Sequence, residues 1–401
     1  MSGPGGEIRG VAVIGAGTMG AGIAQVAAMG GFETRLFDPV DEVRGTVRER
    51  IAGSLDRGAD RGRWSSDDAA AAAGRLEVVD SLEAVAGVDL VIEAVPERLD
   101  LKRELFTELA RVCGPETILA TNTSSLAVTA IAGETPHPER VIGLHFFNPA
   151  PAMKLVEVVS GPLSSPDAAG AAFEAVTRMG KVAIRAADAI GFVANRCARP
   201  YTLEGLRVAG DLGLAPAEID RICRMGAGFP MGPFELIDLV GADINLAVAK
   251  SFHEQSFGEP RWRPVRLQVS MVDSGRLGRK TGRGFYEYGD GPHREPDPEV
   301  EDRRPIVDRD RLAAVAGPDA PVVLERISAQ IVNEALFTLG DEIATESDID
   351  LAMLNGFNWP IGPIEWGREL GFGAVLATLQ GLREEHGEAY RPAPLLRRMA
   401  A

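Results

Sequence analysis

The sequence predicts a doubly wound α/β domain of the Rossmann type, followed by two copies of an all-helical C-terminal domain. Two observations carry this prediction. Near the N-terminus, an apolar run leads directly into the pattern Gly-x-Gly-x-x-Gly at residues 15–20. Further along, two helical segments repeat each other without gaps at a constant shift of 130 residues.

The glycine pattern stands between the apolar run Val11–Ile14 and a stretch, Ala21–Met29, that is rich in helix formers. A strand, a tight turn and a helix in this order form a dinucleotide-binding fingerprint. The first glycine allows the turn, the second lets a pyrophosphate approach the backbone, and the third lets helix and strand pack closely. The helix N-terminus offers free N–H groups to the phosphates. The predicted phosphate-binding residues are Gly15, Gly17, Thr18, Met19 and Gly20.

A second strand, Glu33–Phe37, ends in Asp38, 23 positions after Gly15. A carboxylate at this spacing can accept hydrogen bonds from both hydroxyls of an adenosine ribose. It would also repel a 2′-phosphate, so the sequence favours NAD over NADP. FAD, which uses the same fingerprint, is an alternative, and a tight turn with nothing bound is another.

Composition limits the class of protein. A chain of 401 residues with 45% hydrophobic and 25% charged residues is typical of an ordinary soluble protein of two or three domains. The net charge of −16 makes nucleic acid and anionic membranes poor partners. The three cysteines are sparse and lack metal-ligand spacing, so we expect no metal site and a reduced, cytoplasmic location.

Strands and helices alternate through the first 186 residues, which indicates a mainly parallel sheet. Helices are expected at 43–55 and 66–73, and Pro96 suits the first turn of another that runs to about Cys113. Strands are expected at 76–79, 88–92, 117–120, 140–147, 154–159 and 182–184.

Small polar residues, Thr121–Ser125, follow one of these strands. Ligands of open α/β sheets bind at that carboxyl edge. The turn between the two early helices contains Arg61 and Arg63, which in an acidic protein could receive a phosphate. A solvated turn is the alternative.

One histidine stands out among five because His145 lies at the end of an apolar strand. Glu157 occupies the next apolar strand, also an unusual place for a titratable side chain. A carboxylate that holds an imidazole fixes its tautomer and prepares it to act as a general base. A structural histidine bonded to backbone is the alternative reading of His145.

The repeat sets the domain boundaries that we predict. The NAD-binding domain spans 1–186, helical copy 1 spans 187–288, a Pro-rich acidic linker spans 289–321, and helical copy 2 spans 322–401. Matching positions under the 130-residue shift include Arg196 with Arg326, Glu204 with Glu334, Asp211 with Asp341, Asp220 with Asp350, and Pro230–Glu235 with Pro360–Glu365.

The chain resembles the L-3-hydroxyacyl-CoA dehydrogenase family over residues 8 to about 288, and its tail resembles the family's second C-terminal copy. It looks most like bacterial 3-hydroxybutyryl-CoA and 3-hydroxyadipyl-CoA dehydrogenases with a duplicated C-terminal domain. The motifs that carry the resemblance, in order, are Gly15–Gly20, Thr121–Ser125, His145–Pro149, Gly191–Arg196 and Gly278–Tyr286.

The resemblance implies roles for individual residues. His145 would be the base, Glu157 would orient and charge it, and Ser124 and Asn195 would hold the substrate oxygens. Arg61 and Arg63 replace the family's usual basic turn for the CoA phosphates, and arginine there changes the contact geometry. The implied NAD contacts are Asp38, Glu97, Lys102, Asn122, Asn148 and Lys280.

The resemblance also implies a structural second copy. Copy 2 has Glu325 where copy 1 has Asn195, and no loop like Gly278–Tyr286 follows it. Single-copy members of the family look like dimers formed through this domain. We therefore expect copy 2 to dock on copy 1 within one chain through an apolar interface, giving a monomer or a homodimer.

The expected activity is reversible NAD-dependent oxidation of an acyl-CoA, (S)-3-hydroxyacyl-CoA to 3-oxoacyl-CoA, in fatty-acid β-oxidation or aromatic-acid catabolism. One alternative is oxidation of a free hydroxy acid, as in gulonate dehydrogenases. Another is a crystallin-like or NAD-sensing protein without turnover.

Overall fold

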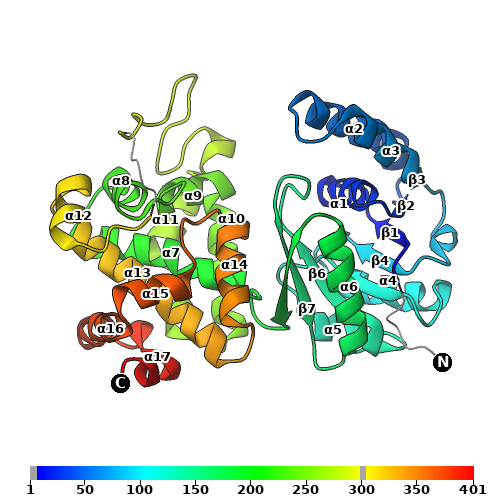
Figure 1. Cartoon of the computed structure of the whole chain (residues 1–401). Coiled ribbons are helices and arrows are strands. Elements are labelled where there is room, and N and C mark those ends of the chain that lie inside the picture. The colour runs from blue at the N-terminus through cyan, green and yellow to red at the C-terminus, as the bar shows by residue number, and fades with distance from the viewer. Residues whose placement is uncertain (1–6, 299–303) are drawn as a thin grey trace. The chain divides into compact units, whose positions relative to one another are not determined.

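The computed structural model describes residues 7–298 and 304–401. It consists of two compact units, Met1–Phe192 and Val193–Ala401. The first contains the sheet and the second is built from helices (Figure 1). Within the described ranges, no helix is long and apolar enough to cross a membrane.

The first unit is built on a sheet of eight strands in the order β3-β2-β1-β4-β5-β6-β7-β8. Neighbouring strands pair in parallel except β6 and β7, which are antiparallel. The predicted doubly wound, parallel-dominated sheet is confirmed, with its switch point between β1 and β4. The strands are β1 (Gly10–Ile14), β2 (Glu33–Phe37), β3 (Leu76–Val78), β4 (Leu90–Glu93), β5 (Ile118–Thr121), β6 (Val141–Phe146), β7 (Leu155–Ser160) and β8 (Val182–Ala187).

Helices cover both faces of this sheet. Along β1, Val11 and Val13 join the core shared with α1, α2, α3 and α6, while Ala12 is equally buried. A strand buried on both faces needs the continuous apolar run seen in the sequence. The helices are α1 (Thr18–Met29), α2 (Asp41–Asp60), α3 (Ser66–Arg75), α4 (Leu99–Val112), α5 (Val128–Ala132) and α6 (Pro166–Arg178).

The second unit has a helical fold with visible internal repetition. Asp220 accepts hydrogen bonds from the first backbone N–H groups of α9, those of Phe234 and Glu235. Asp350, its counterpart at a shift of 130, caps α15 in the same way. The helices are α7 (Ala194–Leu212), α8 (Pro216–Ala227), α9 (Pro233–Val240), α10 (Ala242–Gln255), α11 (Arg266–Asp273), α12 (Arg309–Ala316), α13 (Ala320–Gly340), α14 (Glu346–Gly356), α15 (Pro363–Leu370), α16 (Phe372–His386) and α17 (Pro394–Met399).

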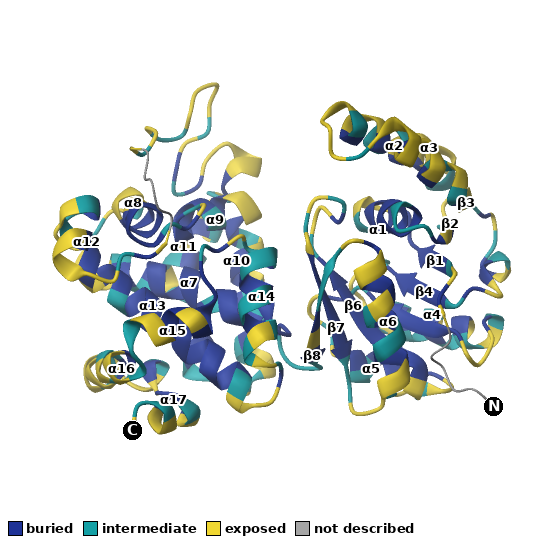
Figure 2. Ribbon diagram, viewed as in Figure 1, coloured by how far each residue is buried: buried dark blue, intermediate teal, exposed yellow. Residues whose placement is uncertain are grey.

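The long helices α7 and α13 pack together, and both are buried over most of their length (Figure 2). Arg196 Nε donates to Glu334 Oε1 at 2.8 Å, and Arg326 Nε donates to Glu204 Oε1 at 2.8 Å. Because Arg196 corresponds to Arg326 and Glu204 to Glu334, the two pairs mirror each other. This reciprocity is what a two-fold symmetric interface produces.

Two further carboxylates extend the mirrored pairs. Arg196 also donates to Asp341 at 2.7 Å, and Arg326 donates to Asp211 at 2.8 Å. The interface, expected to be apolar, therefore also contains buried ion pairs. Glu334, corresponding to Glu204, takes an additional bond from Arg261 at 2.5 Å.

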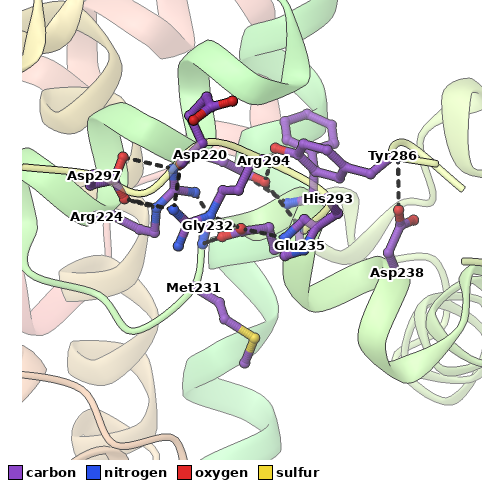
Figure 3. A network of polar contacts seen from close by, with 12 residues as sticks. Asp220, Arg224, Met231, Gly232, Glu235, Asp238, Tyr286, His293, Arg294 and Asp297 are labelled. Atoms are coloured by element: carbon purple, nitrogen blue, oxygen red, sulfur yellow. Dashed lines mark hydrogen bonds and ion pairs between the residues drawn. The ribbon is translucent and has the colours of Figure 1, made fainter. Parts of the chain in front are cut away.

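The segment predicted as a linker begins with residues that are bonded to copy 1 (Figure 3). His293 and Arg294 contact Glu235 at 2.9 and 2.6 Å, and Arg224 donates to the same carboxylate at 2.7 Å. Burial would raise the pKa of Glu235, but these partners and a backbone N–H lower it to about 2.

The same segment also contains a helix that the sequence analysis did not expect. Helix α12 lies on α8, where the Leu312 side chain fills the space beside Gly226. The Ile306 N–H donates to the Gly226 carbonyl at 2.8 Å. The described parts of 289–321 are therefore packed against copy 1 as well as joining the two copies.

The mirrored ion pairs generate the first prediction. Arg326→Ala should lower the free energy of unfolding by about 3–5 kcal/mol, because it leaves the fully buried Glu204 carboxylate without its closest guanidinium. Urea denaturation of the full chain measures this change. The matched control is Arg368→Ala, which removes a half-exposed pair with Glu346 and should cost less than about 1 kcal/mol. Equal losses in the two variants would contradict the assignment.

Candidate active site

The glycine turn leaves room for a diphosphate. A Cβ on Gly20 would lie 1.7 Å from the Gly15 carbonyl oxygen, so helix α1 can approach the turn only with glycine there. A Cβ on Gly17 would meet nothing within 4 Å, so the space in front of it is open. Thr18 and Met19 begin the helix, and their N–H groups face no preceding turn. These features fit the pyrophosphate of NAD.

Asp38 is tied to that turn. Its Oδ2 accepts the Ala16 N–H at 2.8 Å and its Oδ1 accepts the Val40 N–H at 2.9 Å. A carboxylate has about four acceptor positions, so two remain for ribose hydroxyls. The backbone bonds fix the carboxylate at the end of β2, beside the glycine turn.

Glu97 organises the polar turn after β5. Its Oε1 accepts from the Thr123 hydroxyl at 2.6 Å and from the N–H groups of Ser124 and Ser125 at 3.0 Å each. Burial would raise the pKa of Glu97, but Lys102 and these donors lower it. The carboxylate therefore stays charged and holds the turn in place.

Lys102 is buried beneath this turn and its ammonium is occupied. Nζ lies 2.7 and 2.9 Å from the two oxygens of Glu93 and 3.1 Å from Glu97. Two hydrogen bonds to Glu93 and an ion pair with Glu97 engage the ammonium, so Lys102 supports Glu97 in this structure. Sequence reasoning missed Glu93, although a glutamate directly after the apolar run 88–92 was a usable signal.

His145 and Glu157 face each other across the antiparallel pair β6–β7, in register. Nδ1 of His145 lies 2.5 Å from Oε2 of Glu157, and both side chains are buried. The rings of Phe147 and Phe192 lie 4.5 and 5.6 Å from the imidazole ring. Because Nδ1 is bonded to the Glu157 carboxylate, the other ring nitrogen, Nε2, is the atom that can exchange a proton.

Ser124 and Asn122 lie at the end of β5. The Ser124 hydroxyl is exposed and makes no hydrogen bond with any described residue, and helix α5 begins only at Val128, so Ser124 is not its cap. Asn122 Oδ1 accepts the Phe146 N–H at 2.8 Å, which joins the ends of β5 and β6. Its amide N–H groups remain available.

Asn148 is exposed in the loop between β6 and β7. Lys181 holds this loop by donating to the carbonyls of Ala150 at 2.6 Å and Met153 at 2.8 Å. Sequence reasoning also missed this contact, because it depends on a lysine that precedes β8 and has no motif around it.

The basic turn between α2 and α3 has a fixed shape. Trp64 Nε1 donates to the Leu55 carbonyl at 2.9 Å, and its ring lies so close to Gly58 that a Cβ there would clash. The side chains of Arg61 and Arg63 are exposed and bond to none of the described residues. Arg50, which the sequence analysis did not assign, donates to the Ala16 carbonyl in the glycine turn.

The second unit carries Asn195 and Lys280. Asn195 lies in the first turn of α7, whose cap is Val193, so its half-buried amide is not a helix cap. Lys280 Nζ donates to Asp243 at 2.5 Å, and both side chains are partly exposed.

Comparison with known proteins agrees with these features. Residues 10–189 match the family model of the 3-hydroxyacyl-CoA dehydrogenase NAD-binding domain. Residues 191–288 and 322–401 both match the model of the 3-hydroxyacyl-CoA dehydrogenase C-terminal domain. The family comparison therefore finds the same domain type on either side of the segment 289–321.

Several relatives are similar over long stretches. A 3-hydroxyadipyl-CoA dehydrogenase of Escherichia coli K12 is 38% identical, covering 98% of both chains. A probable 3-hydroxybutyryl-CoA dehydrogenase of Bacillus subtilis is 40% identical over 70% of this chain and 98% of its own. The crystal structure of a 3-hydroxybutyryl-CoA dehydrogenase from E. coli K12 superposes with a TM-score of 0.89 at 37% identity, covering 98% of both chains. This chain belongs to the NAD-dependent 3-hydroxyacyl-CoA dehydrogenase family.

Proposed function

We propose that the chain oxidises (S)-3-hydroxyacyl-CoA to 3-oxoacyl-CoA reversibly, with His145 as the general base. The contact of 2.5 Å between His145 Nδ1 and Glu157 Oε2 carries this proposal. The named activities of its relatives, 3-hydroxyadipyl-CoA and 3-hydroxybutyryl-CoA dehydrogenases, support a CoA thioester as substrate.

The proton moves through the imidazole. With Nδ1–H donated to Glu157, the lone pair on Nε2 accepts the proton of the 3-hydroxyl group. The ring becomes an imidazolium, and the adjacent carboxylate stabilises that charge. Bound NAD would supply the acceptor for the hydride that leaves C3. In the reverse direction, the imidazolium returns the proton to the oxygen.

Other side chains bind and orient. We assign the Ser124 hydroxyl and the Asn195 amide to the substrate oxygens, since neither hydrogen-bonds to a described residue. Asp38 binds the ribose, and Glu97, supported by Lys102, fixes the turn that carries Ser124. Asn122, Asn148 and Lys280 are assigned to the cofactor.

Two further proposals concern the chain as a whole. Cys113, Cys197 and Cys223 are buried thiols that form no disulfide, which suits a reducing cytoplasm. The mirrored ion pairs support a second copy that acts as the partner of the first within one chain.

The activity is tested by following NADH formation with (S)-3-hydroxybutyryl-CoA and with free 3-hydroxybutyrate. Turnover of the thioester alone is expected. Turnover of the free acid alone would favour a hydroxy-acid dehydrogenase, and NAD binding without turnover of any thioester would favour a non-enzymatic role.

The proposed base gives the next prediction. His145→Gln should lower kcat by about 10²–10⁴-fold, the usual contribution of general acid–base catalysis, with little change in NAD affinity. The control is His137→Gln, which alters an exposed histidine and should retain full activity. A His145→Gln enzyme within a few-fold of wild type would remove His145 from the mechanism.

Asp38 sets the expected choice of cofactor. Asp38→Asn removes the negative charge that repels a 2′-phosphate and keeps one oxygen for the glycine turn. The ratio of kcat/KM for NAD over NADP should therefore fall, while Asp56→Asn, an exposed carboxylate on α2, should leave it unchanged. Equal use of both cofactors by the unmodified protein would refute the assignment.

The arginine turn is proposed to bind the CoA phosphates. Replacing both Arg61 and Arg63 by alanine should raise KM for the acyl-CoA and leave KM for a CoA-truncated thioester unchanged. The difference should shrink as salt rises, because exposed charges are screened. An unaltered KM for acyl-CoA at low salt would show that the turn takes no part in binding.

A further inference from the structure

Arg199 is a cation without a counter-charge. It lies on α7, its side chain makes no ion pair or hydrogen bond with any described residue, and its Nε is shielded from solvent without a partner. Its guanidinium carbon lies 5.3 Å from the ring centre of Phe252. Burial lowers the pKa of Arg199 to about 10, so it remains charged at neutral pH.

Other buried arginines of this unit have carboxylate partners. Arg196 and Arg326 bond to two carboxylates each across the repeat, and Arg224 bonds to Glu235 and Asp297. Partial desolvation of a cation is costly unless an anion compensates for it. Arg199 therefore has an unfilled requirement for an anion.

The repeat shows that packing does not require this arginine. At a shift of 130, Arg199 corresponds to Ala329 and Asn195 to Glu325. In copy 2, Ala329 and Glu325 line a cavity of about 180 Å³, together with Leu370 and Ala374 from α15 and α16. The same position thus lines a cavity as alanine in copy 2 and carries an arginine in copy 1.

The corresponding surface of copy 1 combines exposed apolar side chains with polar groups, and Lys280 pairs with Asp243 beside Gly241. Val240 and Ile244, which answer to Leu370 and Ala374, are 43% and 47% exposed. Asn195 and Arg199 are four residues apart on α7 and so lie on one helix face, with Cβ atoms about 5–6 Å apart. An amide, exposed apolar side chains and an arginine without a carboxylate partner suit an acyl chain that ends in an anion, whereas the Lys280 ammonium is already paired with Asp243.

We propose that Arg199 recognises the terminal carboxylate of an ω-carboxylated 3-hydroxyacyl-CoA and so determines the preference for such dicarboxylic substrates. This inference rests on the proposed function, in which Asn195 holds a substrate oxygen near C3. In a six-carbon chain, three carbon–carbon bonds separate C3 from the far carboxyl carbon. One helical turn and the arginine side chain can span that length.

The test compares two substrates of equal chain length, 3-hydroxyadipyl-CoA and 3-hydroxyhexanoyl-CoA, in the full-length enzyme. The wild type should have the higher kcat/KM for 3-hydroxyadipyl-CoA. Arg199→Ala, which installs the copy 2 residue, should lower the ratio of the two values by about 10- to 100-fold, mainly through KM, as expected for a lost charged hydrogen bond. Arg199→Lys should restore part of the ratio.

Arg266→Ala is the matched control, since it removes an exposed arginine side chain of the same unit that bonds to no described residue, and it should leave the ratio unchanged. Equal losses on both substrates would overturn the inference and assign Arg199 to packing or to CoA. An unchanged ratio would also overturn it. A wild type that oxidises neither substrate would refute the proposed function itself, whereas one that oxidises both with a ratio insensitive to Arg199 refutes only this inference.

Discussion

The second unit depends on the reciprocal pairing of Arg196 with Glu334 and of Arg326 with Glu204. All four side chains are nearly inaccessible to solvent, so each guanidinium and each carboxylate needs its partner. Removing one partner while the two copies stay packed would leave the other charge buried and uncompensated, which is strongly destabilising. The pairing therefore explains why copy 2 retains its arginine and acids although it has Glu325 in place of the Asn195 amide.

A comparable constraint in the first unit is the register of β6 and β7. This is the antiparallel junction of an otherwise parallel series, and it places His145 directly opposite Glu157. Because successive side chains of a strand point to opposite faces, a shift of one residue would separate the imidazole from its carboxylate. The correct pairing of β6 with β7 therefore also places the His145 imidazole beside the Glu157 carboxylate.

Features that depend on local patterns could be predicted from the sequence. Apolar runs and turn residues predict the strand–turn–helix around Gly15, the mainly parallel sheet, and the strands that bear His145 and Glu157. Features set by side chains meeting across the fold could not. The Lys102 ammonium pairs with Glu93 and Glu97. Glu97 in turn accepts a hydrogen bond from Thr123, and α4 begins only at Leu99, after this contact. The prolines of the segment 289–321 predict a linker, but within it residues 309–316 form the helix α12, which packs on α8.

We propose that hydride leaves C3 of a 3-hydroxyacyl thioester for NAD while His145 takes the hydroxyl proton. The most direct measurement of this step uses (S)-3-hydroxybutyryl-CoA deuterated at C3 and determines the mass of the NADH formed. We expect each NADH to carry one deuterium and 3-oxobutyryl-CoA to appear in equal amount. NADH without deuterium, or 3-oxoacyl product formed without NADH, would contradict the proposal.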